Sequence, residues 1–225
     1  MSFNIGLVVN PLAGLGGSVA LKGSDNVAQE ALARGAVPKA NARCQQALAQ
    51  LTGLDVCVHT YAGEMGANCA TSAGLPVQIM GAANTQPPTA MDTIEAAQIL
   101  VSQGVDLLVF VGGDGTARDL LQAIGDQVPV VGIPAGVKIH SGVYGITPVA
   151  AGQVIAQLVK GELVSLRSQE VRDIDEDEFR AGRVKARYYG ELQVPEAHQY
   201  MQATKDSSQA GGHELESLVL DDIAA

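Results

Sequence analysis

An apolar run that ends in a glycine turn constrains this chain more than any other feature. The run Asp106-Leu-Leu-Val-Phe-Val111 passes into Gly112-Gly-Asp-Gly-Thr116, and a helix-compatible stretch, residues 117–124, follows at once. Strand, glycine turn and helix in this order build phosphate sites in α/β proteins. Glycine lets backbone N–H groups approach a phosphate, and the helix N-terminus adds partial positive charge. The turn therefore predicts a phosphate-binding site.

Asp114 is the unusual residue in this turn, because a carboxylate repels phosphate. It is suited to a place beside Mg²⁺, or to accepting a hydroxyl proton during phosphoryl transfer. The alternative is an ordinary strand-to-helix turn in which Asp114 caps the helix. The turn alone does not decide between the two interpretations.

Composition restricts the class of protein. The 225 residues allow one large α/β domain, or one domain and part of another. Hydrophobic residues make up 47% but aromatic residues only 4%, so the core is aliphatic, as a helix-covered parallel sheet requires. The net charge of -10 disfavours nonspecific binding to nucleic acid or anionic membranes. No apolar run approaches ~18 residues, and no basic leader begins the chain, so we expect a soluble cytoplasmic protein.

Cysteine usage supports a reducing compartment. The chain has three cysteines, Cys44, Cys57 and Cys69, without a CxxC pair. They are typical of small buried hydrophobic residues and not of a disulfide framework or a zinc site.

Apolar strands and helical stretches alternate through the first 160 residues. Strands are predicted at residues 3–9, 55–59, 77–80, 107–111 and 128–133, and helices at 26–34, 38–51, 67–72, 89–103 and 148–159. This alternation implies a three-layer α/β fold with a mainly parallel sheet and right-handed crossovers.

After about residue 160 the pattern changes. Residues 162–170 and 185–194 alternate like half-buried antiparallel strands. Two or three strands do not make a stable sheet alone. We therefore predict an α/β nucleotide-binding domain over residues 1–160, followed by the start of a β-rich domain over residues 161–225 that is incomplete here.

Glycine is concentrated at one edge of the predicted sheet. Ligands of parallel sheets bind outside the carboxyl ends of the strands. Those ends carry Asn10 with its glycine loop, residues 59–61, residues 81–82, the Gly112 to Thr116 turn, and Pro134-Ala-Gly136. Loop sterics alone do not require this distribution, so this edge is the predicted binding edge.

Five segments together make the chain resemble the ATP-NAD kinase superfamily, whose wider relatives include diacylglycerol and sphingosine kinases and phosphofructokinase. Within it the chain is most similar to the branch called ATP-NAD kinase-like or acetoin-catabolism protein X. The segments are Asn10-Pro-Leu-Ala-Gly-Leu-Gly-Gly17, Lys22-Gly-Ser-Asp25, Thr93 to Ala97, Gly112 to Thr116, and Gly132-Ile-Pro-Ala-Gly-Val-Lys-Ile-His-Ser-Gly142. The resemblance extends over residues 3 to about 200, and the combination is far more specific than the turn alone.

The resemblance implies phosphoryl transfer from ATP, with Mg²⁺, to a hydroxyl group. In NAD kinases the acceptor is the 2′-hydroxyl of the adenosine ribose of NAD, and the product is NADP. Carried over to this chain, Asp114 would orient or deprotonate the acceptor hydroxyl. The residues that would border the nucleotide or hold its phosphates are Asn10, Gly14, Gly16, Gly17, Gly112, Gly113, Gly115, Thr116 and Lys138. No metal-ligating residue is assigned.

Two departures leave the acceptor open. NAD kinases carry an Asn-Glu pair well downstream of the turn, and none is found between Thr116 and Ala225. Lipid kinases have Glu three residues past the Thr and then a GTxND motif, where this chain has Asp119 and Gly132-Ile-Pro-Ala-Gly136. The favoured function is an NAD kinase-like enzyme. The alternatives are a non-catalytic nucleotide-sensing protein that keeps the phosphate cradle and, third, a lipid kinase-like enzyme.

Other polar residues have simpler interpretations. Lys138 and His140 follow a glycine turn, where contact with phosphate competes evenly with a surface loop. His59 is typical of a hydrogen-bonded histidine at a strand end. The acidic residues 173–178 are typical of a solvated turn. Ser141 beside His140 is not a nucleophile pair, because adjacent side chains on an extended segment point apart.

The end of the chain predicts self-association. Residues 205–212 are polar and offer little apolar area to offset ordering. Residues 214–223 have one apolar helical face without an obvious place to bury it. We expect this face, or the open edge of the β region, to form a homo-oligomer contact.

Overall fold

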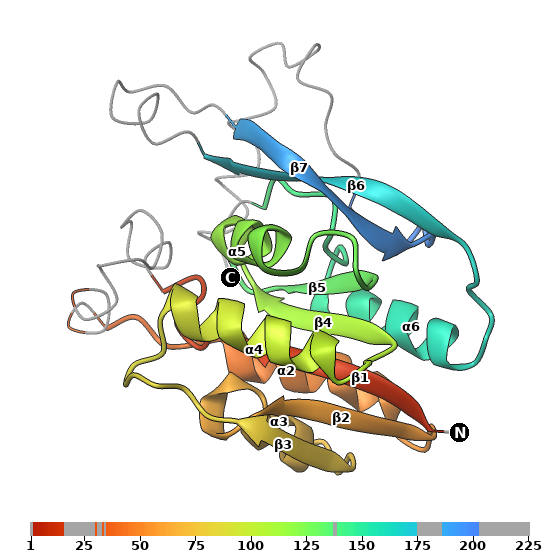
Figure 1. The fold of residues 1–225 in the computed structure, drawn as a ribbon, viewed down its shortest axis with the longest axis horizontal. Helices are drawn as coiled ribbons and strands as arrows, with labels where there is room; N and C mark the ends of the chain where they lie inside the picture. The colour runs from red at the N-terminus through yellow and green to blue at the C-terminus, as the bar shows by residue number, and fades with distance from the viewer. Residues whose placement is uncertain are drawn as a thin grey trace.

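Five parallel strands form the central sheet of the protein, in the order β3-β2-β1-β4-β5 (Figure 1). The structure is a computed structural model, and it describes residues 2–15, 30, 33, 35–136, 139–174 and 186–202. The strands are β1 (Phe3–Val9), β2 (Val56–Tyr61), β3 (Val77–Gly81), β4 (Leu107–Gly112) and β5 (Val130–Pro134). The predicted parallel α/β sheet is confirmed.

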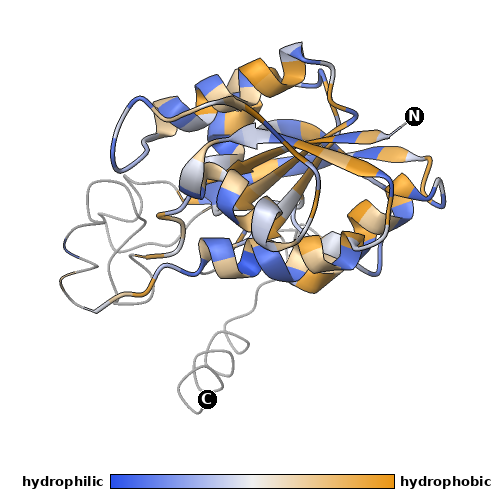
Figure 2. Cartoon of the chain, turned by 90° about the horizontal axis from the view of Figure 1, so that it is seen from below, coloured by the Kyte–Doolittle hydropathy of each residue, from blue (hydrophilic) through white to orange (hydrophobic). Residues whose placement is uncertain are grey.

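Helices cover both faces of this sheet, so the domain has three layers. On one face α4 (Ala90–Ser102) packs beside α5 (Asp114–Ile124). The other face carries α3 (Ala67–Ser72), preceded by the short 3₁₀ helix η3 (Gly63–Met65), and α6 (Pro148–Val159). Between them lies α2 (Ala40–Leu48), which continues into the 3₁₀ helix η2 (Ala49–Leu51) and contacts both neighbours. Hydrophobic strands lie between these helix layers in Figure 2.

The interior strands are buried because both of their faces meet helices. All six residues of β4 are buried, and so are the last five residues of β1. Val9 of β1 pairs with Val111 of β4, which pairs with Ile133 of β5. This register makes the three strands end at the same level, so the loops that follow them begin side by side.

Polar side chains fix the starts of two helices. Thr89 precedes α4 and forms a capping box with Asp92. Thr147 precedes α6 and accepts a hydrogen bond from the Ala150 N–H, while Pro148 occupies the first turn. Both arrangements satisfy N–H groups that the helix itself leaves without partners.

An antiparallel ribbon follows the parallel sheet. It consists of β6 (Leu166–Ile174) and β7 (Ala186–Pro195), and it packs on α5 (Figure 1). The chain between β5 and α6 also returns to the sheet, where Tyr144 forms a bridge with Gly132, and Gly145 forms one with Met201. The predicted boundary at residue 160 lies just before this ribbon, and the division into two domains stays a prediction.

Several predicted element bounds differ from the structure. Helix α5 begins at Asp114, three residues before the predicted start, because the turn glycine Gly113 is already its N-cap. His59 lies inside β2 and not at its end, since pairing with β1 and β3 continues beyond it. Strand β6 starts at Leu166, later than the predicted residue 162.

Some predicted features lie outside the described residues. They are the helix at 26–34, Gly16, Gly17, Lys138, the acidic residues from 175 to 178, and the segment from residue 203 onward. These predictions therefore stay as the sequence analysis states them.

Candidate phosphate-binding site at the carboxyl edge

Three glycine-containing loops meet at the edge where the strands end, which we call the carboxyl edge. They follow β1, β4 and β5. A Cβ atom on Gly14 would lie 2.1 Å from the carbonyl oxygen of Ala135, and one on Gly136 would lie 3.0 Å from the Cα of Gly113. A Cβ atom on Gly112 would lie 2.4 Å from the Thr116 side chain. Close packing between the loops therefore explains the glycines at positions 14 and 136, and close packing against the first turn of α5 explains Gly112.

Gly113 and Gly115 differ from these three glycines. A Cβ atom on Gly113 would meet only ordinary van der Waals neighbours, the nearest at 3.5 Å, and one on Gly115 would come no closer than 3.9 Å to Asp173 Oδ2. Neither has a φ in the left-handed region that favours glycine. The fold does not require glycine at either position, which distinguishes these two glycines from the three that close packing explains.

Asn10 joins the first two loops. Its Nδ2 donates to Thr116 Oγ1 at 3.2 Å, and its Oδ1 accepts from the Leu12 N–H at 3.1 Å. Its backbone N–H donates to the Val111 carbonyl at 3.0 Å. The connections of β1 and β4 run to opposite sides of the sheet, so this is the topological switch point where α/β proteins bind ligands.

The Asp114 carboxylate points away from its own helix and holds the loop after β5. Oδ2 accepts from the His140 N–H at 2.7 Å, and Oδ1 accepts from the N–H and Oγ of Ser141 at 3.0 and 2.6 Å. The interpretation of Asp114 as a helix cap is wrong, because Gly113 is the N-cap and no side-chain cap bond is present.

Burial dominates the electrostatics of Asp114, which is 8% exposed. Desolvation raises the pKa of this carboxyl above its ordinary value, although hydrogen bonds from Ser141 and His140 act in the opposite direction. A raised pKa makes the carboxylate a stronger base than a solvent-exposed aspartate.

Ser141 connects Asp114 to the ribbon. Its hydroxyl donates to Asp114 and accepts from the Arg172 N–H of β6 at 3.0 Å. The neighbouring Gly142 N–H donates to the Glu170 carbonyl at 2.9 Å. Ser141 and the backbone of His140 therefore both donate hydrogen bonds to Asp114, and the ribbon helps to hold Ser141 in place.

Tyr144 is a site residue that the sequence analysis missed. Its hydroxyl donates to the Gly113 carbonyl at 2.6 Å, and its ring meets Phe110 edge-on at 5.1 Å. Burial raises the pKa of Tyr144 well above its ordinary value, so it stays a donor. The sequence signal that could have indicated a residue such as Tyr144 is Gly132, because a glycine inside a strand marks the close approach of another group. A Cβ atom on Gly132 would lie 2.5 Å from the Tyr144 ring.

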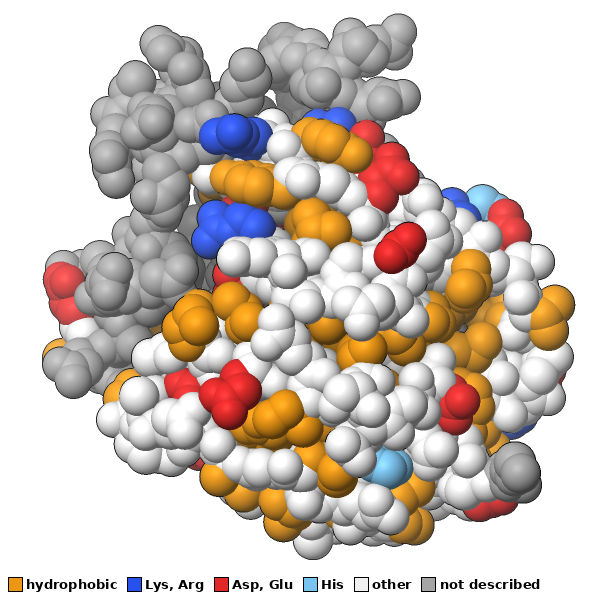
Figure 3. Space-filling view, in the orientation of Figure 1, with side chains coloured by type: hydrophobic (Ala, Val, Ile, Leu, Met, Phe, Trp, Pro, Cys, Tyr) orange, Lys and Arg blue, Asp and Glu red, His pale blue; other side chains and the backbone are white. Residues whose placement is uncertain are grey.

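The ribbon adds charged and aromatic residues beside Gly115, which the sequence analysis also missed. Arg118 of α5 pairs with Asp173 of β6 at 3.0 Å, and the guanidinium groups of Arg118 and Arg187 lie 5.6 and 5.5 Å from the centroid of the Tyr189 ring. Asp173 is therefore part of an ion pair on a strand, not of a solvated turn. Most of the basic side chains visible in Figure 3 lie toward the end of the molecule that carries the β6–β7 ribbon.

The two histidines near the predicted strand ends have different surroundings. His140 lies in the site, and its Nε2 is buried without a hydrogen-bond partner. His59 lies away from the site, with Nε2 3.3 Å from Asn4 Oδ1. Within the described ranges, no three His, Cys, Asp or Glu side chains gather as a metal-binding group.

Comparison with known proteins identifies the family. The chain matches the ATP-NAD kinase N-terminal domain over residues 5–163. The chain therefore belongs to this family. No curated protein sequence matches it.

Two solved structures from Bacillus anthracis str. Sterne are similar. One, provisionally named a diacylglycerol kinase, has 15% sequence identity to this chain and a TM-score of 0.34. The alignment covers 73% of this chain and 45% of the other protein. The second, named a diacylglycerol kinase, is 16% identical with a TM-score of 0.34, covering 80% and 50%. The chain thus spans about half the length of these proteins.

None of the helices in the described part of the chain has the length and apolar character that crossing a bilayer requires.

Proposed function

We propose that this chain binds a nucleoside triphosphate at the carboxyl edge and transfers its terminal phosphoryl group to a hydroxyl, as an NAD kinase-like enzyme that converts NAD to NADP. One observation carries the proposal: Gly113 and Gly115 leave open backbone at the start of α5 although loop packing does not demand glycine there. Membership in the ATP-NAD kinase N-terminal domain family supports the reaction class.

The residues of the site have distinct roles in this proposal. Backbone N–H groups of Gly113, Gly115 and Thr116 face the phosphates at the positive end of α5. Asn10 holds Thr116 and borders the nucleotide. Gly14 lets the loop after β1 pack against the loop after β5, and Gly112 leaves room for the Thr116 side chain. The resemblance adds Gly16, Gly17 and Lys138, which lie outside the described residues.

Mg²⁺ fits this site as a companion of the nucleotide. It would neutralise charge on the phosphates, which would act as its main ligands, because no metal-binding group gathers among the described residues. The donor set agrees with this, because the Asp114 oxygens already accept hydrogen bonds and do not form an open metal-binding group.

Asp114 is the proposed base. Oδ1 accepts two hydrogen bonds and Oδ2 only one from the described residues, so Oδ2 keeps one acceptor position for a substrate hydroxyl. The hydroxyl proton passes to Oδ2 while the hydroxyl oxygen attacks the terminal phosphorus and the nucleoside diphosphate leaves. The raised pKa of Asp114 favours this proton transfer.

A non-catalytic nucleotide-binding protein is the second candidate. Asp114 is buried and accepts three hydrogen bonds, one from the His140 N–H and two from the N–H and hydroxyl of Ser141. This favours the non-catalytic candidate, because a carboxylate bonded in this way also holds a loop in place without chemistry. The missing Asn-Glu pair points the same way. A lipid kinase-like activity remains the third candidate.

Incubation of the protein with ATP, Mg²⁺ and NAD, NADH, diacylglycerol or acetoin, with phosphate transfer followed, separates these functions. Phosphorylation of NAD supports the first candidate, and ATP binding without transfer supports the second. Transfer to diacylglycerol supports the third. Failure to bind ATP contradicts all three.

Two variants test the site itself. Gly115→Val should abolish ATP binding and leave the urea unfolding midpoint nearly unchanged. Asp114→Asn should lower turnover by roughly 10²–10⁴-fold and change ATP affinity by only a few-fold. Asp126→Asn makes the same chemical change at an exposed position after α5 and is the matched control. Unchanged turnover in Asp114→Asn would remove Asp114 from the chemistry.

We further propose a cytoplasmic location and a homo-oligomer. The composition and the apolar pattern in the sequence of residues 214–223 support these proposals. Light scattering that gives a strict monomer would contradict the oligomer.

A further inference from the structure

A hollow opens at the carboxyl edge, on the opposite side of the sheet from Asp114. It is a cavity of about 500 Å³ between the first turn of α2, the end of β5 and the start of α6. This volume is within the usual range of small-molecule sites. Pro134 lines it, and the chain from Pro134 to Gly136 separates it from the phosphate cradle.

The charge of this hollow is unlike that of the chain. Lys39 and Arg43 line it, and no carboxylate does among the described residues, although the net charge of the protein is -10. Arg43 Nη1 donates to the Pro134 carbonyl at 3.1 Å, which fixes the guanidinium and leaves it further N–H donors. The local field therefore favours an anion.

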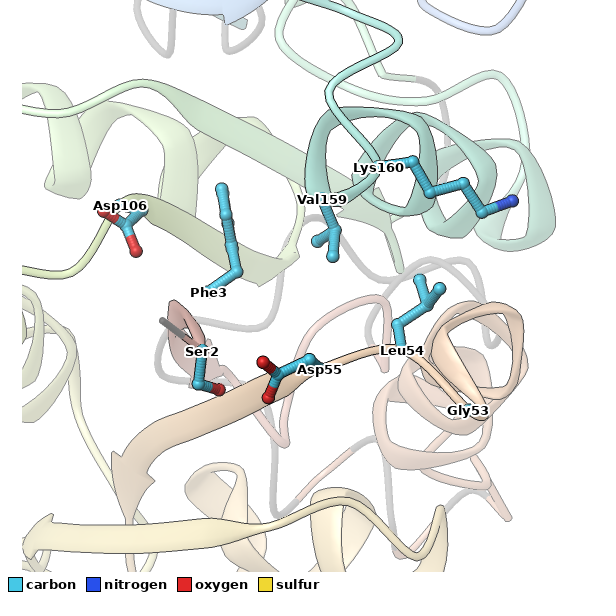
Figure 4. A pocket seen from close by; sticks show the side chains of 8 residues that line it. All are labelled: Ser2, Phe3, Gly53, Leu54, Asp55, Asp106, Val159 and Lys160. Atoms are coloured by element: carbon cyan, nitrogen blue, oxygen red, sulfur yellow. The ribbon is translucent and has the colours of Figure 1, made fainter.

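The opposite edge of the sheet, where the strands begin, provides the contrast. We call it the amino edge. A hollow of about 450 Å³ there is lined by Asp55 and Asp106, which directly precede β2 and β4, with Lys160 at the end of α6 (Figure 4). Its two carboxylates outnumber its one cation, so hollows of similar size at the two edges differ in the sign of their charge.

The cationic hollow also has an apolar side. Ile146 is 52% exposed although it is a large aliphatic residue, and Pro134 and Pro148 line the same space. Val149, in the first turn of α6, is exposed as well. Apolar walls with a few polar groups are the usual composition of a small-molecule site.

We propose that this hollow is a binding site for a small anionic molecule that also carries an apolar group. Lys39 and Arg43 bind its phosphate or carboxylate, and Ile146 and Pro148 contact its apolar part. The site is separate from the phosphate cradle and does not rest on the proposed phosphoryl transfer.

Fluorine NMR with 4-fluorophenyl phosphate tests the proposal, because binding broadens the probe signal. Lys39→Glu should weaken binding roughly tenfold, the effect of losing one hydrogen bond to a charged group. Lys160→Glu makes the same charge change at the amino edge and should leave binding unchanged. The neutral 4-fluorobenzyl alcohol should bind at least about tenfold more weakly than the phosphate, for the same reason.

A third variant distinguishes this hollow from the cradle. Gly115→Val fills the cradle and should not affect the probe. Absence of probe binding to the wild-type protein overturns the proposal, and so does equal binding to Lys39→Glu. Loss of binding in Gly115→Val also overturns it, since the probe would then occupy the phosphate cradle. Because this readout needs neither ATP nor turnover, it stands apart from any failure of the proposed enzyme activity.

Discussion

The two edges of the central sheet use glycine for different reasons. At the amino edge, Gly53, Gly74, Gly104 and Gly125 precede β2, β3, β4 and β5, all with positive φ and with nothing within 4 Å of a Cβ atom. At the carboxyl edge, a Cβ atom on Gly14 or Gly136 would meet the backbone of a neighbouring loop, and one on Gly112 would meet the Thr116 side chain. The amino-edge glycines thus satisfy a backbone conformation alone, whereas the carboxyl-edge glycines make room for close packing, at Gly14 in addition to a positive φ.

The edges also differ in how carboxylates are used. At the carboxyl edge, buried Asp92 and Asp114 each hold a loop through several hydrogen bonds. At the amino edge, exposed Asp106 accepts one hydrogen bond, from the Asn4 N–H at 2.8 Å. This contrast teaches that, within the described residues, buried carboxylates hold the loops at the edge that carries the site, as precise ligand positioning requires.

The largest effect is expected from alanine at Gly14. Gly14 and Gly104 have nearly the same φ, +77° and +74°, so alanine brings similar backbone strain at both. Only at Gly14 does the new Cβ atom collide, 2.1 Å from the Ala135 oxygen. We expect Gly104→Ala to lower the free energy of unfolding by about 1 kcal/mol and Gly14→Ala by roughly 3 kcal/mol or more.

Urea unfolding of the two variants measures this difference. Because Gly14→Ala also displaces the loop that borders the cradle, its ATP affinity should fall, while that of Gly104→Ala should not. Equal losses of stability would show that glycine has the same role at both edges.

The next effect concerns Asp92 and its pH dependence. Asp92 accepts from the Asn84 N–H, the Thr85 hydroxyl, and the N–H and hydroxyl of Thr89 at 2.7 to 2.8 Å. Burial raises its pKa, but these hydrogen bonds outweigh burial and lower the pKa below the ordinary value of 3.8. Since the native pKa is the lower one, ionised Asp92 stabilises the fold above about pH 4 and loses this contribution as the pH falls.

Asp92→Asn should therefore lower the free energy of unfolding at pH 7 by about 2 kcal/mol. The difference between wild type and variant should shrink as the pH drops below about 4. Urea titrations at pH 7, 5 and 3 test this. If the difference in free energy of unfolding between wild type and Asp92→Asn stays constant over this pH range, the effect comes from the geometry of the side chain and not from its charge.

The sequence predicted the parallel sheet well because hydrophobic runs and glycine punctuation are local signals. The run Leu107–Val111 and the helix 148–159 needed no knowledge of distant residues. Tyr144 and Arg118 were missed because their partners, the Gly113 carbonyl and Asp173, are 31 and 55 residues away. Their hydrogen bonds depend on how β5 and the ribbon return to the site, and no local pattern records that path.

The same distinction decides against one of the two interpretations of Asp114, the helix cap. A local rule makes an aspartate at a strand-to-helix turn a cap, since a short carboxylate next to free N–H groups satisfies them. In the fold, the loop after β5 brings the N–H groups of His140 and Ser141 within reach, and the carboxylate binds them. Tertiary contacts, which sequence periodicity does not contain, overrode the local preference.

The smallest effect is expected at the amino edge. Asp106 is exposed, and Asn in its place keeps an oxygen that can accept the Asn4 N–H. Asp106→Asn should therefore lower the free energy of unfolding by only about 0.5 kcal/mol, and added salt should remove most of that loss because exposed charges are screened. Urea unfolding in low and high salt measures both values. Asp92→Asn is the matched comparison, since the chemical change is the same in a buried, multiply bonded setting. A loss at Asp106 as large as at Asp92 would mean that carboxylates hold the two edges alike, and the contrast between the edges would fail.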